Sequence, residues 1–164
     1  MHRKVNKIRI GSGIDVHPFT EGCPLVLGGV TIPYEKGLLG HSDADVLIHA
    51  ICDALLGAAN LGDIGQHFPD TDPQYKNIDS KLLLKETLQL IKAKNYAIGN
   101  IDCTVCAQKP KLLPYISLMK DTLAGILMLS IEDISIKATT TEKLGFVGRE
   151  EGICAMAMIL IVKQ

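Results

Sequence analysis

The sequence predicts an α+β domain with a sandwich-like arrangement, in which helices cover one face of a mixed four-stranded sheet. Strand segments are mixed with helical segments, and no long run of β-α-β units indicates a doubly wound parallel sheet. No internal repeat or linker interrupts the 164 residues, of which 47% are hydrophobic. We therefore expect residues 1–164 to form a single domain with a full core.

The first half of the chain is expected to contain three strands and one long helix. We predict strands at Lys7–Ile14, Leu25–Leu27 and Val30–Ile32, the last two within a stretch punctuated by Gly and Pro. A helix is predicted over residues 43–61, because apolar residues at helical spacing form one stripe: Leu47, Ile51, Ala54, Leu55 and Ala58.

The second half repeats this mixture of helices and strands. A cap at Asp79 or Ser80 begins a helix to about Lys94, and a further helix is expected at Tyr115–Leu127. Apolar residues alternate with polar ones around Ile101–Val105, as in a half-buried strand. The last two strands are predicted at Ile134–Ala138 and Ile153–Val162.

The final strand is unusually apolar. From Gly152 to Val162 there is no charged side chain and no alternation of polar with apolar residues, which indicates a strand covered on both faces. Helices cover one face, and the other is covered by the same chain or by another subunit. We favour another subunit, because small domains hide apolar sheet faces by symmetric association.

Composition excludes several classes of protein. Seventeen Lys and Arg residues nearly balance eighteen Asp and Glu residues, and they form no basic stripe, so we expect no nucleic-acid or membrane partner. The basic start, Met1–Lys4, is not followed by the apolar run of a secretion signal, which predicts a cytoplasmic protein or one of a plastid-type stroma. Five cysteines fit a reducing compartment, and Cys103 and Cys106 should face opposite sides of a strand.

Two histidines and a carboxylate are spaced so that one divalent metal ion could gather them. Asp15 and His17 are two residues apart and point the same way, while His49 approaches from the predicted helix. This is the ligand set of a zinc site with an open fourth position. Asp53, one turn after His49, is a candidate to orient the imidazole. The alternative is a solvated helix face, because Asp45, His49 and Asp53 form a polar stripe opposite the apolar one.

Three loops carry further candidate groups. Residues 137–149 are rich in hydroxyl groups that can cradle phosphate, and Glu142 can hold a hard cation there; an ST-turn without a ligand is the alternative. Residues 107–113 follow a strand and supply cationic side chains. Residues 62–73 have carboxylates that either orient a polyol or form Asx-turns, and we favour turns for Asp70 and Asp72.

Several motifs, in order along nearly the whole chain, resemble the 2-C-methyl-D-erythritol 2,4-cyclodiphosphate synthase family. They are Asp15-Val16-His17, Gly40-His41-Ser42-Asp43, residues 54–59, residues 61–65, residues 67–72, Ala107-Gln108, Pro110-Lys111-Leu112 and residues 137–149.

The resemblance implies a homotrimer around a central hydrophobic cavity, with active sites between subunits. The implied reaction is a step of non-mevalonate isoprenoid biosynthesis, catalysed by a phosphorus–oxygen lyase. It converts 4-diphosphocytidyl-2-C-methyl-D-erythritol 2-phosphate, a cytidine diphosphate-linked molecule, to the cyclic diphosphate with release of CMP. The substrate's own 2-phosphate is the nucleophile. Two alternatives stay open: a zinc-dependent phosphohydrolase and a non-catalytic trimer that binds isoprenoid diphosphates.

The resemblance also implies a role for each matched residue. Asp15, His17 and His49 are implied zinc ligands, Glu142 an implied ligand of Mg²⁺ or Mn²⁺ on the substrate diphosphate, and His41 and Thr140 catalytic positioning residues. An isoprenoid diphosphate is expected in the cavity near Phe146 and Arg149. The full set of expected substrate contacts is Asp15, His17, His41, Ser42, Asp63, Ile64, Gly65, Phe68, Pro69, Asp70, Thr71, Asp72, Ala107, Gln108, Lys109, Pro110, Lys111, Leu112, Leu113, Thr139, Thr140, Thr141, Glu142, Phe146 and Arg149.

Overall fold

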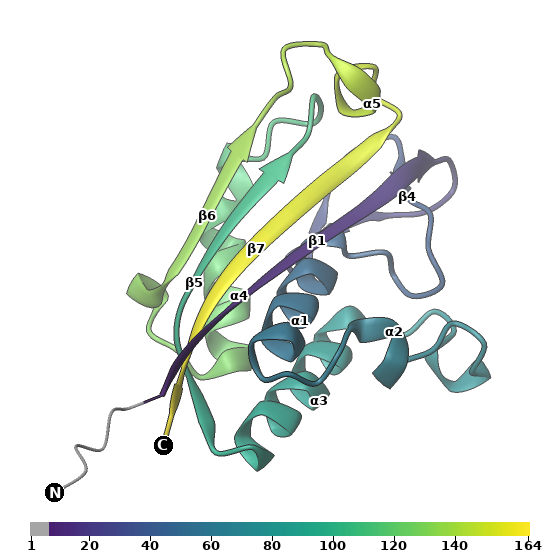
Figure 1. The fold of residues 1–164 in the computed structure, drawn as a ribbon. Coiled ribbons are helices and arrows are strands. Elements are labelled where there is room, and N and C mark those ends of the chain that lie inside the picture. Colours follow the sequence, from purple (N-terminus) through teal and green to yellow (C-terminus); the bar gives the residue numbers. More distant parts are fainter. Residues whose placement is uncertain (1–6) are drawn as a thin grey trace, which may run out of the picture.

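A computed structural model describes residues 7–164 and shows one mixed sheet with helices packed on one of its faces (Figure 1). The basic residues 1–4, on which the expected lack of a secretion signal rests, lie outside the described part. The α+β class is therefore confirmed, whereas the predicted number of strands in the sheet is wrong.

The main sheet has five strands in the order β4-β1-β7-β5-β6. Their bounds are β1 Ile8–Thr20, β4 Gly37–Leu38, β5 Tyr96–Cys106, β6 Ile134–Thr139 and β7 Gly152–Lys163. The fifth strand is β4, which pairs with the end of β1 because β1 runs six residues further than the predicted Ile14. β4 contains only two residues, which is too short for the alternation of apolar and polar residues that predicts a strand. The short strands β2 (Leu25–Leu27) and β3 (Val30–Ile32) form a separate two-stranded ribbon, as predicted in position.

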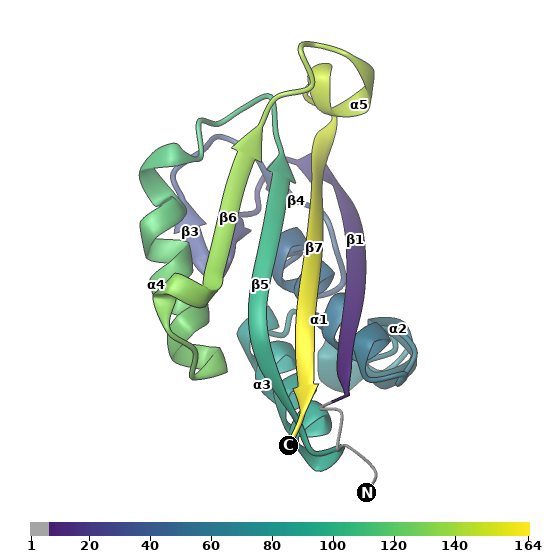
Figure 2. The same cartoon turned by 60° about the vertical axis from the view of Figure 1, so that its left-hand side comes forward.

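Three long helices lie on the same side of the sheet (Figures 1 and 2). They are α1 Val46–Ala58, α3 Ser80–Ala93 and α4 Ile116–Leu127, and all three positions agree with the predicted segments within a few residues. Two single-turn helices, α2 (Ile64–His67) and α5 (Gly145–Gly148), lie in loops that carry candidate site residues. Single-turn helices of this kind are too short to give a periodic signal.

Strand β7 is buried on one face only. Its residues alternate, with Ile153, Ala155 and Ala157 buried against the helices and Met156 and Met158 exposed on the other face. β7 lies in the middle of the sheet, so a central position does not by itself cover both faces. Burial of this strand within the single chain, the alternative weighed above, is therefore wrong.

The uncovered side of β1 and β7 forms an apolar surface, here called the open sheet face. Register pairs Ile14 with Met156 and Ile10 with Leu160, so these side chains lie beside one another. Ile10 is 78% exposed and Ile14 62% exposed. Contiguous exposed apolar side chains on a sheet are typical of a surface that another protein covers.

Helix α1 packs unusually close to strand β1. A Cβ atom added at Gly13 would lie 2.0 Å from the carbonyl oxygen of Ala50, and one added at Gly11 would lie 1.9 Å from that of Ala54. Both glycines alternate onto the buried face of β1, and they meet the small side chains of α1. Glycine is required at both positions because any side chain would push the helix away.

The start of α1 is fixed by a buried carboxylate. Asp45 is fully buried and accepts hydrogen bonds from the N–H groups of Ile48 (3.0 Å), Gly28 (2.9 Å) and Gly29 (2.6 Å). It is the N-cap of the helix and ties it to the turn between β2 and β3. The alternative of a solvated polar stripe therefore does not hold for Asp45, because this residue is the buried cap and lies before the first helical turn.

Within residues 7–164, no helix combines the length and the apolar character that crossing a membrane requires. The cytoplasmic location stays a prediction.

We expect Gly13→Ala to destabilise the fold by about 1–3 kcal/mol, because its methyl group overlaps the backbone of α1 and the helix must shift. Chemical denaturation measures the change. Gly57→Ala is the matched control: it lies on α1 with open space around it, and should raise stability by roughly 0.5–1 kcal/mol through helix propensity. Equal stability of the two variants would contradict the close packing.

Candidate functional site

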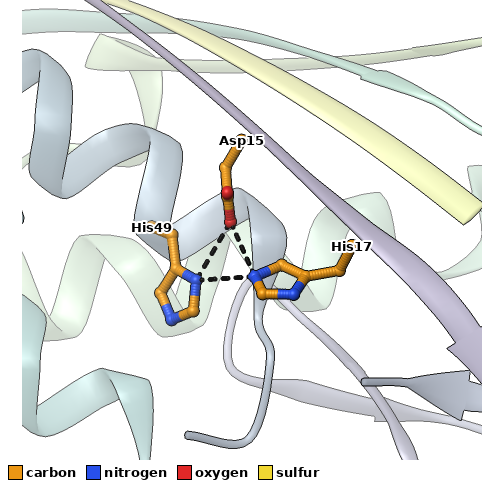
Figure 3. A group of neighbouring side chains, drawn as sticks. All are labelled: Asp15, His17 and His49. Atoms are coloured by element: carbon orange, nitrogen blue, oxygen red, sulfur yellow. Dashed lines mark hydrogen bonds and ion pairs between the residues drawn. The ribbon is translucent and has the colours of Figure 1, made fainter. Parts of the chain in front are cut away.

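Asp15, His17 and His49 meet at one point between β1 and α1 (Figure 3). Asp15 Oδ2 lies 2.9 Å from His17 Nε2 and 3.0 Å from His49 Nδ1, and the two ring nitrogens are 3.2 Å apart. The two strand residues alternate onto the same face of β1, while His49 comes from α1 one residue before Ala50, the position that packs on Gly13. The predicted convergence of these three residues is confirmed.

The triangle of ligand atoms fits a small tetrahedral metal ion. Zinc ligands at about 2.0 Å from the metal are separated by roughly 3.3 Å along each edge of a tetrahedron. The three measured separations of 2.9–3.2 Å are close to that edge. Two imidazoles and one carboxylate are a donor set that zinc accepts, and three protein ligands leave one position open to a substrate oxygen.

Each imidazole is held by a second hydrogen bond on the ring nitrogen that faces away from the triangle. His17 Nδ1 lies 2.7 Å from the carbonyl oxygen of Leu39, so it carries the proton and leaves Nε2 free to bind metal. His49 Nε2 lies 3.0 Å from both Ser42 Oγ and Ser80 Oγ, which leaves Nδ1 as its metal-binding atom.

The hydrogen bonds around His49 continue to a second carboxylate. Ser80 is fully buried at the start of α3, and its hydroxyl donates to Asp43, so its lone pairs accept the proton of His49 Nε2. Asp43 also accepts the backbone N–H of Ser80 at 3.1 Å. Asp53, proposed above to orient His49, instead accepts the N–H of Ile64 at 2.7 Å.

Ser80 was missed as a site residue. It is 31 residues from His49 along the chain, and the only sequence signal at this position was the cap of a helix. The contact depends on how α3 is placed against α1, which no local pattern gives.

The protonation states of Asp15 and His17 depend on the hydrogen bonds that join the three candidate metal ligands. Burial opposes ionisation of Asp15, but hydrogen bonds with His17 and His49 outweigh it and lower the pKa of Asp15 well below its ordinary value. Burial disfavours the charged form of His17, yet the hydrogen bond to Asp15 raises the pKa of His17 above its ordinary value. The carboxylate is therefore ready to bind a cation at neutral pH.

A pocket of about 170 Å³ adjoins the triangle and collects several predicted substrate contacts. His41 reaches it with a buried Nε2 atom that has no hydrogen-bond partner among the described residues, so this atom is available to a ligand. The pocket is lined by His17, His41, Ser42, His49, Ile64, Gly65, Phe68, Asp70, Tyr75, Ile78 and Leu83.

Two predicted substrate carboxylates are engaged in caps instead of lining this pocket. Asp63 caps α2 and accepts from the N–H and the side-chain amide of Gln66. Asp72 caps a 3₁₀ turn and accepts from the same two groups of Gln74. The turn favoured for Asp72 is therefore confirmed, whereas Asp70 lines the pocket.

The loops after β5 and β6 form a second pocket of about 190 Å³. Lys143 N–H donates to Gln108 Oε1 at 3.2 Å and so ties the two loops together. Lys109 lies outside the lining, where its ammonium pairs with Glu150 at 3.2 Å. The lining residues are Ala107, Gln108, Pro110, Lys111, Leu112, Leu113, Ala138, Thr139 and Thr140.

Glu142 lies at the tip of the hydroxyl-rich loop beside this pocket. Its carboxylate accepts the hydroxyl hydrogen of Thr140 at 3.0 Å, and its backbone has a positive φ of 52°. The Thr140 hydroxyl also accepts the N–H of Glu142, which is the ST-turn named above as the alternative. The turn leaves one carboxylate oxygen of Glu142 free for a cation.

The two pockets share no lining residue, so this chain by itself does not combine the metal triangle with the second pocket. Phe146, on α5, is 38% exposed. Arg149 follows α5 and pairs with Glu151 through Nε at 2.8 Å and Nη2 at 3.1 Å. Neither residue lines either pocket.

The family model and the curated relatives that match this chain point to the same family. The model of the YgbB family matches residues 8–162. A 2-C-methyl-D-erythritol 2,4-cyclodiphosphate synthase of Bacteroides thetaiotaomicron is 64% identical over 158 residues, covering 96% of this chain and 99% of the relative. The enzyme of the same name from Bacillus cytotoxicus is 58% identical, covering 95% and 99%.

Solved structures similar to this chain belong to the same family of enzymes. A 2C-methyl-D-erythritol-2,4-cyclodiphosphate synthase with CDP bound aligns with a TM-score of 0.86 at 37% identity, covering 93% of this chain and 99% of that one. The bifunctional IspDF of Campylobacter jejuni aligns with a TM-score of 0.94 at 45% identity. It covers 98% of this chain, which spans 43% of that longer protein.

We expect Ser80→Ala to weaken zinc binding by about ten- to a hundredfold, because His49 loses one of the two hydroxyl groups that fix its ring, the one that Asp43 holds in place. Competition with a fluorescent chelator measures the affinity. Ser135→Ala, on an exposed position of β6, is the control and should bind as the parent does. Unchanged affinity in Ser80→Ala would remove Ser80 from the site.

Zinc affinity should fall as pH drops through the raised pKa of His17. A protonated imidazole has no lone pair for the metal, and each displaced proton lowers affinity by about tenfold per pH unit below that pKa. Asp15 stays ionised over this range because its pKa is lowered, so it adds no dependence. The same chelator titration from neutral to mildly acid pH tests this, and a flat profile would contradict it.

Proposed function

This chain belongs to the YgbB family, and we propose that it catalyses the cyclisation of 4-diphosphocytidyl-2-C-methyl-D-erythritol 2-phosphate. A 2-phosphate oxygen of the substrate attacks its β-phosphorus, the bond from that phosphorus to the oxygen of the α-phosphate breaks, and CMP leaves. The product is 2-C-methyl-D-erythritol 2,4-cyclodiphosphate. The enzyme is a phosphorus–oxygen lyase of the non-mevalonate isoprenoid pathway.

One observation carries the proposal: the Asp15, His17 and His49 triangle opens onto a pocket in a chain whose relatives carry that name. The substrate supplies its own nucleophile, so the protein needs no activated serine or cysteine. It must hold two phosphates in line and stabilise charge as the bond to CMP breaks.

The triangle would hold Zn²⁺, which when bound acts as a Lewis acid on the phosphate. His41, with its free buried Nε2, is placed to donate to a substrate oxygen and so to fix the phosphate in line. Ser42, beside it, is available to the same group through its hydroxyl. Ser80 and Asp43 keep the His49 ring from rotating.

The second pocket is the proposed site of the cytidine and the diphosphate. Its support is the CDP named in two solved structures of relatives, together with the backbone and hydroxyl groups of Thr139 and Thr140. Glu142 would hold Mg²⁺ or Mn²⁺, whose charge when bound offsets that of the phosphates. Thr140 is then placed to position the diphosphate as bond cleavage begins.

A complete site needs both pockets, which supports assembly of a homotrimer with active sites between subunits. The open sheet face supplies the apolar surface for that contact, and a second subunit would bring its nucleotide pocket to the metal triangle of the first. Phe146 and Arg149 would then line a central hydrophobic cavity, with the arginine as the partner for an isoprenoid diphosphate.

We expect the metal-replete protein to convert the substrate to CMP and a cyclic diphosphate, seen as a coupled pair of phosphorus NMR signals, and to lose this activity on chelation. His49→Ala should lower turnover by at least about a thousandfold, because a three-ligand site loses one ligand and its charge stabilisation. Its circular dichroism and sedimentation should match those of the parent, since the substitution leaves the glycine contacts of α1 intact.

The same experiment separates the alternatives. CMP with only linear phosphates would indicate a zinc-dependent phosphohydrolase that activates water. Saturable binding of an isoprenoid diphosphate without any turnover would indicate a non-catalytic binding trimer. Full activity of His49→Ala would remove His49 from the zinc site.

A further inference from the structure

The loop that lines one side of the metal pocket has little regular structure. We call residues 61–68 the α2 loop, because the single-turn helix α2 is the regular element within them. The loop contributes Ile64, Gly65 and Phe68 to the lining of the pocket beside the metal triangle. A helix of one turn is not stable by itself. Contacts with the rest of the chain must therefore set where this part of the lining lies.

One hydrogen bond ties the α2 loop to helix α1. The carboxylate of Asp53 accepts the backbone N–H of Ile64 at 2.7 Å. Asp53 is partly buried on α1, and α2 lies beside this helix (Figure 1). Within the described part of the chain, no other hydrogen bond joins residues 64–68 to a residue outside the loop. The Asp53 carboxylate is thus the polar link between α2 and the helix that carries His49.

The other contacts of the α2 loop close it on itself. Asp63 accepts from the N–H and the side-chain amide of Gln66, and His67 Nε2 lies 2.8 Å from the carbonyl oxygen of Leu61. The side chain of Ile64 packs against the core, but apolar contact is non-directional and does not orient a peptide group. These contacts shape the loop, and the orientation of α2 on α1 depends on the hydrogen bond to the Ile64 N–H.

The anchor lies one helical turn from a metal ligand. Asp53 follows His49 by one turn of α1, which is a rise of about 5–6 Å along the helix axis. Both ring nitrogens of His49 have other partners, Nδ1 with Asp15 and Nε2 with two serine hydroxyl groups, so Asp53 makes no hydrogen bond with that ring. Helix α1 therefore carries a ligand of the metal triangle and the anchor of the pocket lining at a fixed spacing.

The same bond orients a predicted substrate contact. The N–H of Ile64 belongs to the planar peptide group that joins Asp63 to Ile64. Fixing that plane also fixes the backbone from which the Asp63 side chain leaves. The Asp53 carboxylate thus sets the direction of both residues at the start of α2.

We propose that Asp53 is a positioning residue, which holds the α2 loop so that its lining residues bind the methylerythritol part of the substrate at a set distance from the metal triangle. This inference rests on the proposed function. Without the bond, the loop would spend part of its time in arrangements that do not bind substrate. The apparent affinity for substrate then falls in proportion to the fraction that stays competent.

Steady-state kinetics of the metal-replete protein test this role. Asp53→Ala should raise KM about tenfold, as when about a tenth of the protein keeps a competent loop. It should change kcat by less than about twofold, because bound substrate holds the loop in place. Asp53→Asn keeps an oxygen that accepts from Ile64, so its KM should rise at most about threefold. Asp121→Ala, an exposed acid on α4, is the control and should match the parent.

The donor side of the bond supplies a second variant. Ile64→Pro removes the N–H, and proline is well tolerated at the first position of a helix. This variant also loses the isoleucine side chain from the pocket, so it has an effect of its own. If the bond is the link, adding Asp53→Ala to Ile64→Pro should raise KM by less than about twofold. Circular dichroism checks that each variant folds.

Two measurements do not depend on turnover. Zinc affinity, measured by chelator competition, should be the same in Asp53→Ala as in the parent. Amide hydrogen exchange of a peptide covering residues 62–68, without substrate, should be faster in Asp53→Ala and unchanged in Asp121→Ala.

The outcomes separate this inference from the proposed function. Absence of cyclic product from the parent would overturn the proposed function. Product from the parent with an unchanged KM and unchanged exchange in Asp53→Ala would overturn only the positioning role. The role also fails if zinc affinity falls as KM rises, if Asp53→Asn is impaired as much as Asp53→Ala, or if the effects of Asp53→Ala and Ile64→Pro add.

Discussion

The close contact between α1 and β1 is the constraint on which the rest of the site depends. Gly11 and Gly13 leave no side chain between strand and helix, so the carbonyl oxygens of α1 lie where Cβ atoms would otherwise be. Asp15 and His17 continue the same face of β1, and His49 adjoins Ala50 at the point of contact. A helix displaced by even one methyl group would separate the ligand atoms, which now lie 2.9–3.2 Å apart. The close packing of α1 on β1 thus sets the distances between the three metal-ligand atoms.

A second layer of contacts makes that geometry rigid. Asp45 anchors the start of α1 to the β2–β3 turn, so the helix cannot slide along the strand. Ser80, at the start of α3, contacts the ring of His49 and is itself held by Asp43, which precedes α1; the Leu39 carbonyl fixes the ring of His17. Each imidazole is therefore held from the side opposite the metal, which preserves the open fourth position for a phosphate oxygen.

The same sheet serves two purposes on its two faces. Its inner face builds the core and the metal triangle, while the open sheet face stays apolar and uncovered in the single chain. The nucleotide pocket and the metal pocket are separate within one chain. The proposed reaction therefore needs a neighbouring subunit, which brings the two pockets together, in addition to zinc. Association would then supply both stability, through apolar burial, and the second half of the site.

The sequence by itself determined what depends on local periodicity: the class of fold, the three long helices, the apolar stripe of α1, and the shared direction of Asp15 and His17. Its motifs also indicated the family. Only the tertiary structure decided which distant segments meet. It showed that Asp45 is a buried helix cap, that His49 contacts Ser80 and not Asp53, and that β4 belongs to the sheet. The physical reason is that periodicity fixes the direction of a side chain along its own element, whereas register and helix placement are set by packing between elements far apart in sequence.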